Sequence, residues 1–187
     1  MSTQRLFTPA PLRISAPMRI LPIIAALLVA TPVLAQTRPA TPPPRPDGPK
    51  SIGTFQDWQA ATYAEGGQPV CYAFTRPKTA GTVPGRGEVN LTVTQRPSLR
   101  DAVSISAGFS YAANAEVKVV AGAANLDFYT AQRSAFARSG ASAVAAFTKA
   151  PQAIARSPGP RGEVSDIFSM KGFTAAYAAI NKACPPK

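Results

Sequence analysis

Apolar and polar side chains alternate through the middle of the chain, and this pattern restricts the fold more than any other feature. Glu88–Thr94 carries Val, Leu and Val at every second position, and Ala102–Phe109 repeats the alternation. Glu116–Val120 and Asn125–Thr130 continue it. Successive side chains of a strand point to opposite faces, so a period of two predicts strands with one buried face.

Four further stretches complete the expected sheet. Ile52–Thr62 and Val70–Thr75 come before the alternating region, and Gln152–Ser157 and Val164–Met170 follow it. Pro158–Gly162 carries the residues of a turn between the last two. About eight short strands with brief connections predict a mainly β fold, an antiparallel β-sandwich or barrel.

Two stretches have the period of a helix instead. Ser139–Lys149 is rich in Ala and stops before Pro151. Phe173–Lys182 places apolar residues at its first, fifth and eighth positions, after Gly172. These spacings predict one short internal helix and one C-terminal helix on the sheet.

The N-terminal segment has the features of an export signal. Ile20–Ala35 is apolar, follows Met18-Arg19 and ends in small residues, so residues 1–35 are expected to be a secretory signal peptide cut before Gln36. An uncleaved anchor is the alternative, but a span needs roughly 20 apolar residues, and this run is shorter and contains two prolines. We expect no transmembrane span after cleavage. A further hypothesis is that Met18 is the true start, which makes residues 1–17 a mis-called extension.

Between the signal and the folded part lies a proline-rich segment. Thr37–Lys50 contains six Pro in 14 residues, which favours an extended spacer over residues 36–50. A ligand for a proline-binding domain is the alternative. Residues 51–187 are then one β-rich domain, long enough to bury a core of its own.

Basic residues outnumber acidic ones, 20 to 9, which gives the chain a formal charge of +11. Within residues 51–187 the counts are 14 and 8, so the domain carries +6. The excess either keeps the protein soluble or attracts an anionic envelope component such as lipopolysaccharide, acidic glycan or lipid head groups. No motif for nucleic acid is present. The expected contacts lie on loops that we place at one end of the fold: Arg76, Lys78, Arg86, Arg96 and Arg100.

The chain has no His and two Cys, and these counts exclude several classes of site. Ser-His-Asp triads, Cys-His dyads, His-ligated zinc and four-cysteine clusters are all impossible. Glu163 and Asp166 lie on opposite faces of their expected strand, so they do not form a catalytic acid pair. We therefore expect no cofactor, no metal and no enzymatic activity; a hydrolase that uses carboxylates or a Ser-Lys pair is the remaining alternative.

The two cysteines, Cys71 and Cys184, lie in an early strand and after the last helix. In an exported protein an even pair predicts a disulfide. It would close a loop of 113 residues and fasten the final helix to the sheet, worth about 4–5 kcal/mol at most. A redox-active or metal-binding pair is the alternative, although no C-x-x-C motif is present.

Several short motifs follow one another in a fixed order. They are Phe55-Gln56-Asp57-Trp58, Cys71-Tyr72, Arg76-Pro77, the run Asp166–Phe173 (DIFSMKGF) and the late Cys184. Taken together over about residues 52–185, they resemble the invasion-associated locus B family of exported alphaproteobacterial proteins. Many members carry another Cys shortly after the Trp, where this chain has Ala60 and Ala61.

The resemblance implies periplasmic or secreted residence and, in some pathogenic relatives, a virulence-associated link to host-cell invasion. It brings no established reaction, ligand or catalytic residue. The expected function is therefore an exported, non-catalytic binding module of the bacterial envelope or surface with an unknown protein partner. The alternative is an envelope accessory protein that binds anionic lipid or glycan through its basic loops.

Overall fold

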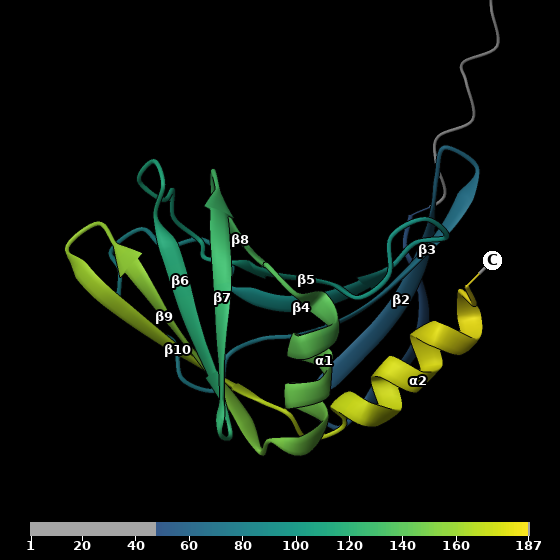
Figure 1. Cartoon of the computed structure of the whole chain (residues 1–187). Coiled ribbons are helices and arrows are strands. Elements are labelled where there is room, and N and C mark those ends of the chain that lie inside the picture. Colours follow the sequence, from purple (N-terminus) through teal and green to yellow (C-terminus); the bar gives the residue numbers. More distant parts are fainter. Residues whose placement is uncertain (1–47, 187) are drawn as a thin grey trace, which may run out of the picture. The chain divides into compact units, whose positions relative to one another are not determined.

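The computed structural model describes residues 48–186 (Figure 1). The predictions for the signal peptide, its extension and nearly all of the spacer lie outside these residues. The elements in chain order are β1 (Lys50–Phe55), β2 (Trp58–Glu65), β3 (Gln68–Thr75), β4 (Asn90–Gln95), β5 (Ala102–Ser106), β6 (Glu116–Ala121), β7 (Ala124–Ala131), β8 (Ser134–Ala137), α1 (Gly140–Lys149), β9 (Gln152–Gly159), β10 (Gly162–Ser169) and α2 (Phe173–Ala183).

The ten described strands form one open antiparallel sheet in the order β1-β2-β3-β4-β5-β8-β7-β6-β9-β10. The sheet is strongly curved, and both helices lie on its concave side (Figure 1). The mainly β, antiparallel fold with an internal and a C-terminal helix is confirmed. The strands form a single sheet of ten where about eight were expected. We call the concave side the inner face and the convex side the outer face.

The first expected strand, Ile52–Thr62, is a hairpin instead. β1 and β2 pair with Phe55 opposite Trp58, and the chain reverses at Gln56 and Asp57. Gln56 has a φ of 52°, a left-handed conformation that suits a tight reversal. Because apolar residues stand on both sides of this turn, the run reads as one continuous strand in the sequence.

Strand β8 has no counterpart in the prediction. It is four residues long, and only Ala135 is buried, so the alternation is too short to be recognised. The strand before it in the sheet, β5, ends at Ser106 rather than at Phe109. Gly108, with a φ of 76°, lies in the loop that follows.

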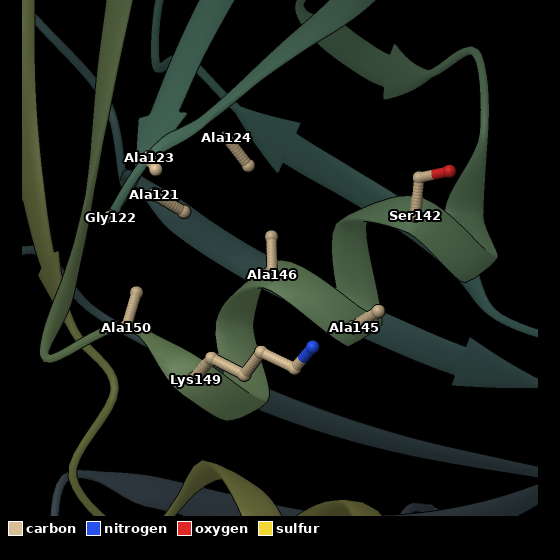
Figure 2. Close-up of a pocket in the computed structure, with 9 residues that line it drawn as sticks. All are labelled: Ala121, Gly122, Ala123, Ala124, Ser142, Ala145, Ala146, Lys149 and Ala150. Carbon is tan, nitrogen blue, oxygen red and sulfur yellow. The ribbon is translucent and has the colours of Figure 1, made fainter.

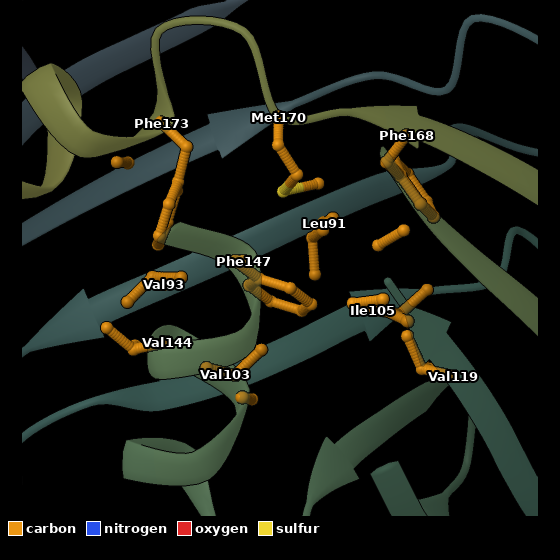
Figure 3. Close-up of a cluster of buried hydrophobic side chains, with 14 of the residues drawn as sticks. Leu91, Val93, Val103, Ile105, Val119, Val144, Phe147, Phe168, Met170 and Phe173 are labelled. Carbon is orange, nitrogen blue, oxygen red and sulfur yellow. The ribbon is translucent and has the colours of Figure 1, made fainter. Parts of the chain in front are cut away.

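The core lies between the inner face of the sheet and the two helices. The alternating residues of β4 and β5 are almost fully buried there, as the period of two predicts. Phe147 of α1 and Phe173 of α2 pack edge to face, with ring centres 5.7 Å apart. Figure 3 shows Leu91, Val93, Val103, Ile105, Val119, Val144, Phe147, Phe168, Met170 and Phe173.

The position of α2 depends on its first residues. Gly172, the N-cap, has a φ of 87°, and a Cβ there would lie 1.9 Å from the carbonyl oxygen of Phe55, so only glycine fits. Trp58 is fully buried beside the helix: its Nε1 donates to the carbonyl of Ser169 at 2.9 Å, and its ring lies 4.9 Å from that of Phe173. Trp58 is therefore a core residue.

The inner face at β9 and β10 is covered by loops rather than by a helix. Phe109, Tyr111 and Val83 pack against Val164 of β10. The chain after β3 also runs along the outer edge of β10, where Lys78 N donates to Ile167 O at 2.7 Å. Within residues 48–186, neither helix has the length and apolar character that a membrane span requires.

Candidate functional site

Cys71 on β3 and Cys184 after α2 form the predicted disulfide, with their Cα atoms 5.9 Å apart. Both residues are buried, Cys71 completely. The bond therefore holds the end of α2 against the inner face of the sheet, in the structural role that the sequence analysis gives it.

Polar contacts hold the same end of α2. Arg100, in the loop after β4, donates from Nη1 to the carbonyl of Cys184 at 2.7 Å and from Nη2 to the side chain of Asn181. Tyr177 donates its hydroxyl to Asp101 Oδ1 at 2.7 Å. Burial and this bond raise the pKa of Tyr177. Arg100 therefore anchors the last turns of α2 to the β4–β5 loop.

Arg86 and Asp166 form a buried ion pair under the loops at the other end of the inner face. Arg86 Nη1 and Nη2 donate to the two carboxylate oxygens of Asp166 at 2.8 and 2.6 Å. The side chains are 7% and 0% exposed. Arg86 also donates to the carbonyls of Ala107 and Gly81, and its guanidinium lies 5.3 Å from the ring centre of Phe109. All three guanidinium nitrogens of Arg86 therefore have hydrogen-bond partners inside the fold.

Tyr111 lies beside this pair and shares its burial. Its hydroxyl is 3.1 Å from the hydroxyl of Ser157, which is completely buried in β9. Burial raises the pKa of Tyr111, and the negative charge of Asp166 adds to the effect. The loop-covered end therefore contains a small polar interior of neutral and ionised groups.

The three other candidate cations take part in ion pairs nearer the surface. Arg76 pairs with Glu88 at 2.7 Å, Lys78 with Asp57 at 2.6 Å and Arg96 with Glu65 at 2.8 Å. The hydrogen bond from Lys78 lowers the pKa of Asp57, and that from Arg96 lowers the pKa of Glu65. An anionic partner would have to displace these carboxylates.

The expectation of one positive end is wrong. Arg76 and Lys78 follow the end of β3, whereas Arg96 and Arg100 follow the end of β4. Because β3 and β4 are antiparallel, these two groups lie at opposite ends of the strands. Arg86 is also not a surface cation, because Asp166, 80 residues away in sequence, neutralises it in the interior.

One groove brings two carboxylates together. Glu116 and Glu163 line it on the outer face, with Lys118 and Arg156. Both acids are exposed, and Glu116 accepts a hydrogen bond from Arg138 at 2.7 Å. Asp166 lies on the opposite face of β10 from Glu163, as the period of two predicts.

Aromatic side chains form a second kind of surface on the outer face. Tyr129 of β7 is 46% exposed and stacks on Phe136 of β8, with ring centres 5.5 Å apart. The guanidinium of Arg138 lies 5.9 Å from the Tyr129 ring. Tyr129 takes the outward position between the inward-facing neighbours of β7, so the alternation in the sequence already places it on the outer face.

A second aromatic group lies on the same face at β2 and β3. Tyr72 of β3 contacts Tyr63 of β2 and Phe74, with ring centres 5.9 Å apart in each case. Direct pairing runs from Phe74 through Thr92 and Ser104 to Phe136. The two aromatic groups are therefore the ends of one row, with small hydroxyl residues between them.

A groove also runs between α1 and the turn of the β6–β7 hairpin (Figure 2). Its volume is about 490 Å³, and seven of its nine lining residues are Ala or Gly. The other two, Ser142 and Lys149, are seven positions apart on α1, about 10 Å of helix rise. The hydroxyl of Ser142 accepts a hydrogen bond from the hydroxyl of Ser139 at 2.7 Å, and Ser142 and Lys149 form no Ser-Lys pair.

Within residues 48–186, no group of three or more Cys, Asp or Glu is arranged to hold a metal ion. No family model matches the chain. No curated protein matches it either. The chain is similar to the crystal structure of invasion associated protein B from Bartonella henselae, at 14% identity and a TM-score of 0.49, over 70% of this chain and 97% of that one. The name of that protein agrees with the resemblance found in the motifs.

Proposed function

We propose that the protein is an exported, non-catalytic interaction module of the cell envelope that binds a partner protein through its outer face. The observation that carries the proposal is the exposed Tyr129 stacked on the half-buried Phe136, with Arg138 beside them. Tyr, Phe and Arg are enriched at protein interfaces, whereas the solvent face of a sheet is normally polar.

The arrangement of the row supports a flat contact with another protein. Phe136 pairs across the sheet with Ser104, so the aromatic group continues into a strip of small hydroxyl residues. That strip leads to the second group, Tyr72 and Phe74, three strand spacings from Phe136, or about 14 Å. Large anchors on both sides of a small-residue strip give a partner two points of contact.

The disulfide supports export. Structural disulfides form and persist in oxidising compartments outside the cytosol, and the bond between Cys71 and Cys184 is buried and joins two elements of the fold. The resemblance to an exported family favours the same location, periplasmic or secreted. A role in contact with host cells stays a prediction from that resemblance.

The state of the acidic residues supports a non-catalytic role. Each carboxylate but one in residues 48–186 accepts hydrogen bonds: Asp57, Glu65, Glu88, Asp101, Glu116, Asp127 and Asp166. Such bonds lower the pKa of Asp57, Glu65 and Asp127, which makes these carboxylates weaker bases near neutral pH. Among the described residues, most of the carboxylates are engaged in ion pairs within the chain.

The test is photo-crosslinking in the native cell. A photoreactive phenylalanine analogue at Tyr129 is expected to crosslink to one envelope protein, identified by mass spectrometry. The matched control carries the analogue at Leu99, the other large apolar residue exposed in the described chain, at 52%. Leu99 lies in the β4–β5 loop, outside the strands that carry Tyr129 and Phe136.

Equal crosslinking from both positions, or none from either, would contradict the proposed interface. Location is measured separately by cell fractionation, and retention in the cytosol with two free thiols would contradict export. A glycan or lipid recovered at Tyr129 in place of a protein would favour the alternative class of partner.

A further inference from the structure

The groove beside α1 is apolar because its walls have almost no side chains. Ala145 and Ala146 form the helix side, and Ala121 and Ala124 form the hairpin side (Figure 2). Ala121 and Ala146 are almost fully buried, so the floor is continuous with the core. The volume, about 490 Å³, lies within the range of sites that hold small ligands.

Water in this groove has few hydrogen-bond partners. Every lining side chain apart from Ser142 and Lys149 is a methyl group or a hydrogen atom. Replacing such water with an alkyl chain is favourable, because apolar surface leaves water on both sides. The shape and composition therefore suit an unbranched apolar chain.

Lys149 adds a single positive charge to this surface. It lines the groove, it is exposed, and it has no ion pair or hydrogen bond among residues 48–186. Side chains of a helix lean toward its N-terminus, and the Lys149 ammonium accordingly lies near Ala145 (Figure 2). No carboxylate lines the groove, so its charge is complementary to an anion.

We propose that this groove binds one single-chain anionic amphiphile of the fatty carboxylate class. The alkyl chain lies between α1 and the β6–β7 turn, and the carboxylate contacts Lys149. This goes beyond the proposed function, because α1 lies on the inner side of the sheet and the aromatic row on the outer side. A wholly apolar ligand would leave Lys149 unused, and a sugar would find Ser142 as its one hydroxyl partner.

The first experiment titrates the purified protein with decanoate, below its micelle concentration, and follows amide signals by NMR. Decanoate is expected to shift the amides of Ala124, Ala146 and Lys149 in a saturable way. Decyl maltoside has an alkyl chain one methylene longer and an uncharged head, and it is expected to bind about tenfold more weakly. Shifts spread over the whole surface, or equal binding of both amphiphiles, would overturn the proposal.

Variants test the two parts of the groove. Ala145→Phe fills the space and is expected to weaken decanoate at least tenfold, whereas Ala141→Phe, also exposed on α1 but outside the groove, leaves binding unchanged. Lys149→Gln is expected to weaken decanoate about tenfold and decyl maltoside hardly at all. Lys182→Gln, in the last turn of α2, is its matched control.

Because Ala141 and Ala145 are both exposed, we expect the two Phe variants to fold, and circular dichroism checks this. If Ala145→Phe folds and binds decanoate as the unaltered protein does, the groove is not the site. If Lys149→Gln and Lys182→Gln weaken binding equally, the attraction is unspecific. Anionic phospholipid vesicles that bind more tightly than decanoate would indicate a membrane surface instead and would also overturn the single-chain site.

Discussion

The two ends of the inner face are closed by different means. At one end α1 and α2 cover the sheet with packed aromatic rings, and a disulfide joins Cys184 to β3. At the other end loops cover β9 and β10, and the ion pair between Arg86 and Asp166 joins them to the strand. One closure is covalent, and the other is electrostatic.

The two closures act on different states of the chain. A disulfide stabilises mainly by restricting the unfolded chain, so its native contacts can survive without it. A buried ion pair acts in the folded state, and removing one partner leaves the other charged and buried. The loop end should therefore be the more sensitive to a single substitution.

The largest effect is expected for Arg86→Ala. It leaves Asp166 buried with one remaining donor, the backbone N–H of Gly81, and frees the carbonyl of Ala107. We expect a loss of about 4 kcal/mol in the free energy of unfolding, measured by urea denaturation. Arg76→Ala, which removes an exposed pair with Glu88, is the control and should cost less than about 1 kcal/mol.

The double variant Arg86→Met with Asp166→Leu tests whether the loss comes from the unpaired charge. It removes both charges and keeps apolar volume, so it should recover much of the lost stability. A double variant less stable than Arg86→Ala would show that the stabilisation does not come from balancing the two buried charges. A cost below about 1 kcal/mol for Arg86→Ala would contradict its burial.

Removal of the disulfide is expected to have the next largest effect. Cys71→Ala with Cys184→Ala should cost about 3 kcal/mol in the free energy of unfolding, less than the chain-entropy maximum. The helix should stay in place, because Arg100 and Tyr177 still hold it. NMR signals of Tyr177 would report its position. An unfolded or helix-detached double variant would show that the covalent bond is required for the fold.

A smaller effect is expected for Tyr177→Phe, which removes the hydroxyl bond to Asp101 and keeps the ring. The cost should be about 1 kcal/mol. In the protein without the disulfide, the same substitution should also detach the end of α2, because fewer contacts then hold it. Identical costs with and without the disulfide would mean that the two contacts act independently.

The smallest effect concerns alkaline pH. Because burial raises the pKa of Tyr111 above its ordinary value near 10, the folded state keeps the proton after the unfolded state has lost it. The free energy of unfolding therefore falls as the pH rises above about 10. Tyr111→Phe should reduce this fall, and Tyr177→Phe should reduce it less, since Tyr111 is the more deeply buried. Identical alkaline profiles for the two variants would contradict this ranking.

The sequence predicts most of the strands, the C-terminal helix and the disulfide well. Alternation identifies β4, β6 and β7, helical spacing identifies α2, and the two cysteines are the complete set that could pair. These signals are local, or unique in the chain. Their physical cause is that one buried face imposes a period on each element.

The loop-covered end could not be predicted in the same way. Arg86 lies in a glycine-rich loop and resembles any surface cation in the sequence, because its partner Asp166 is 80 residues away and meets it only where this loop runs along β10. The groove at α1 likewise depends on the distance between Ala146 and Ala121, which no spacing in the sequence fixes. Contacts between distant segments with no repeating pattern leave no local signal.

The bond between Cys71 and Cys184 makes the chain between them a covalent ring. This ring contains every element from β4 to α2. A protease that cuts one exposed loop within it, such as the segment around Pro84 and Gly85, opens the ring but releases no fragment. The cut protein keeps its mass on a non-reducing gel and separates into two pieces only after reduction. A single proteolytic event therefore leaves the two parts of the sheet joined.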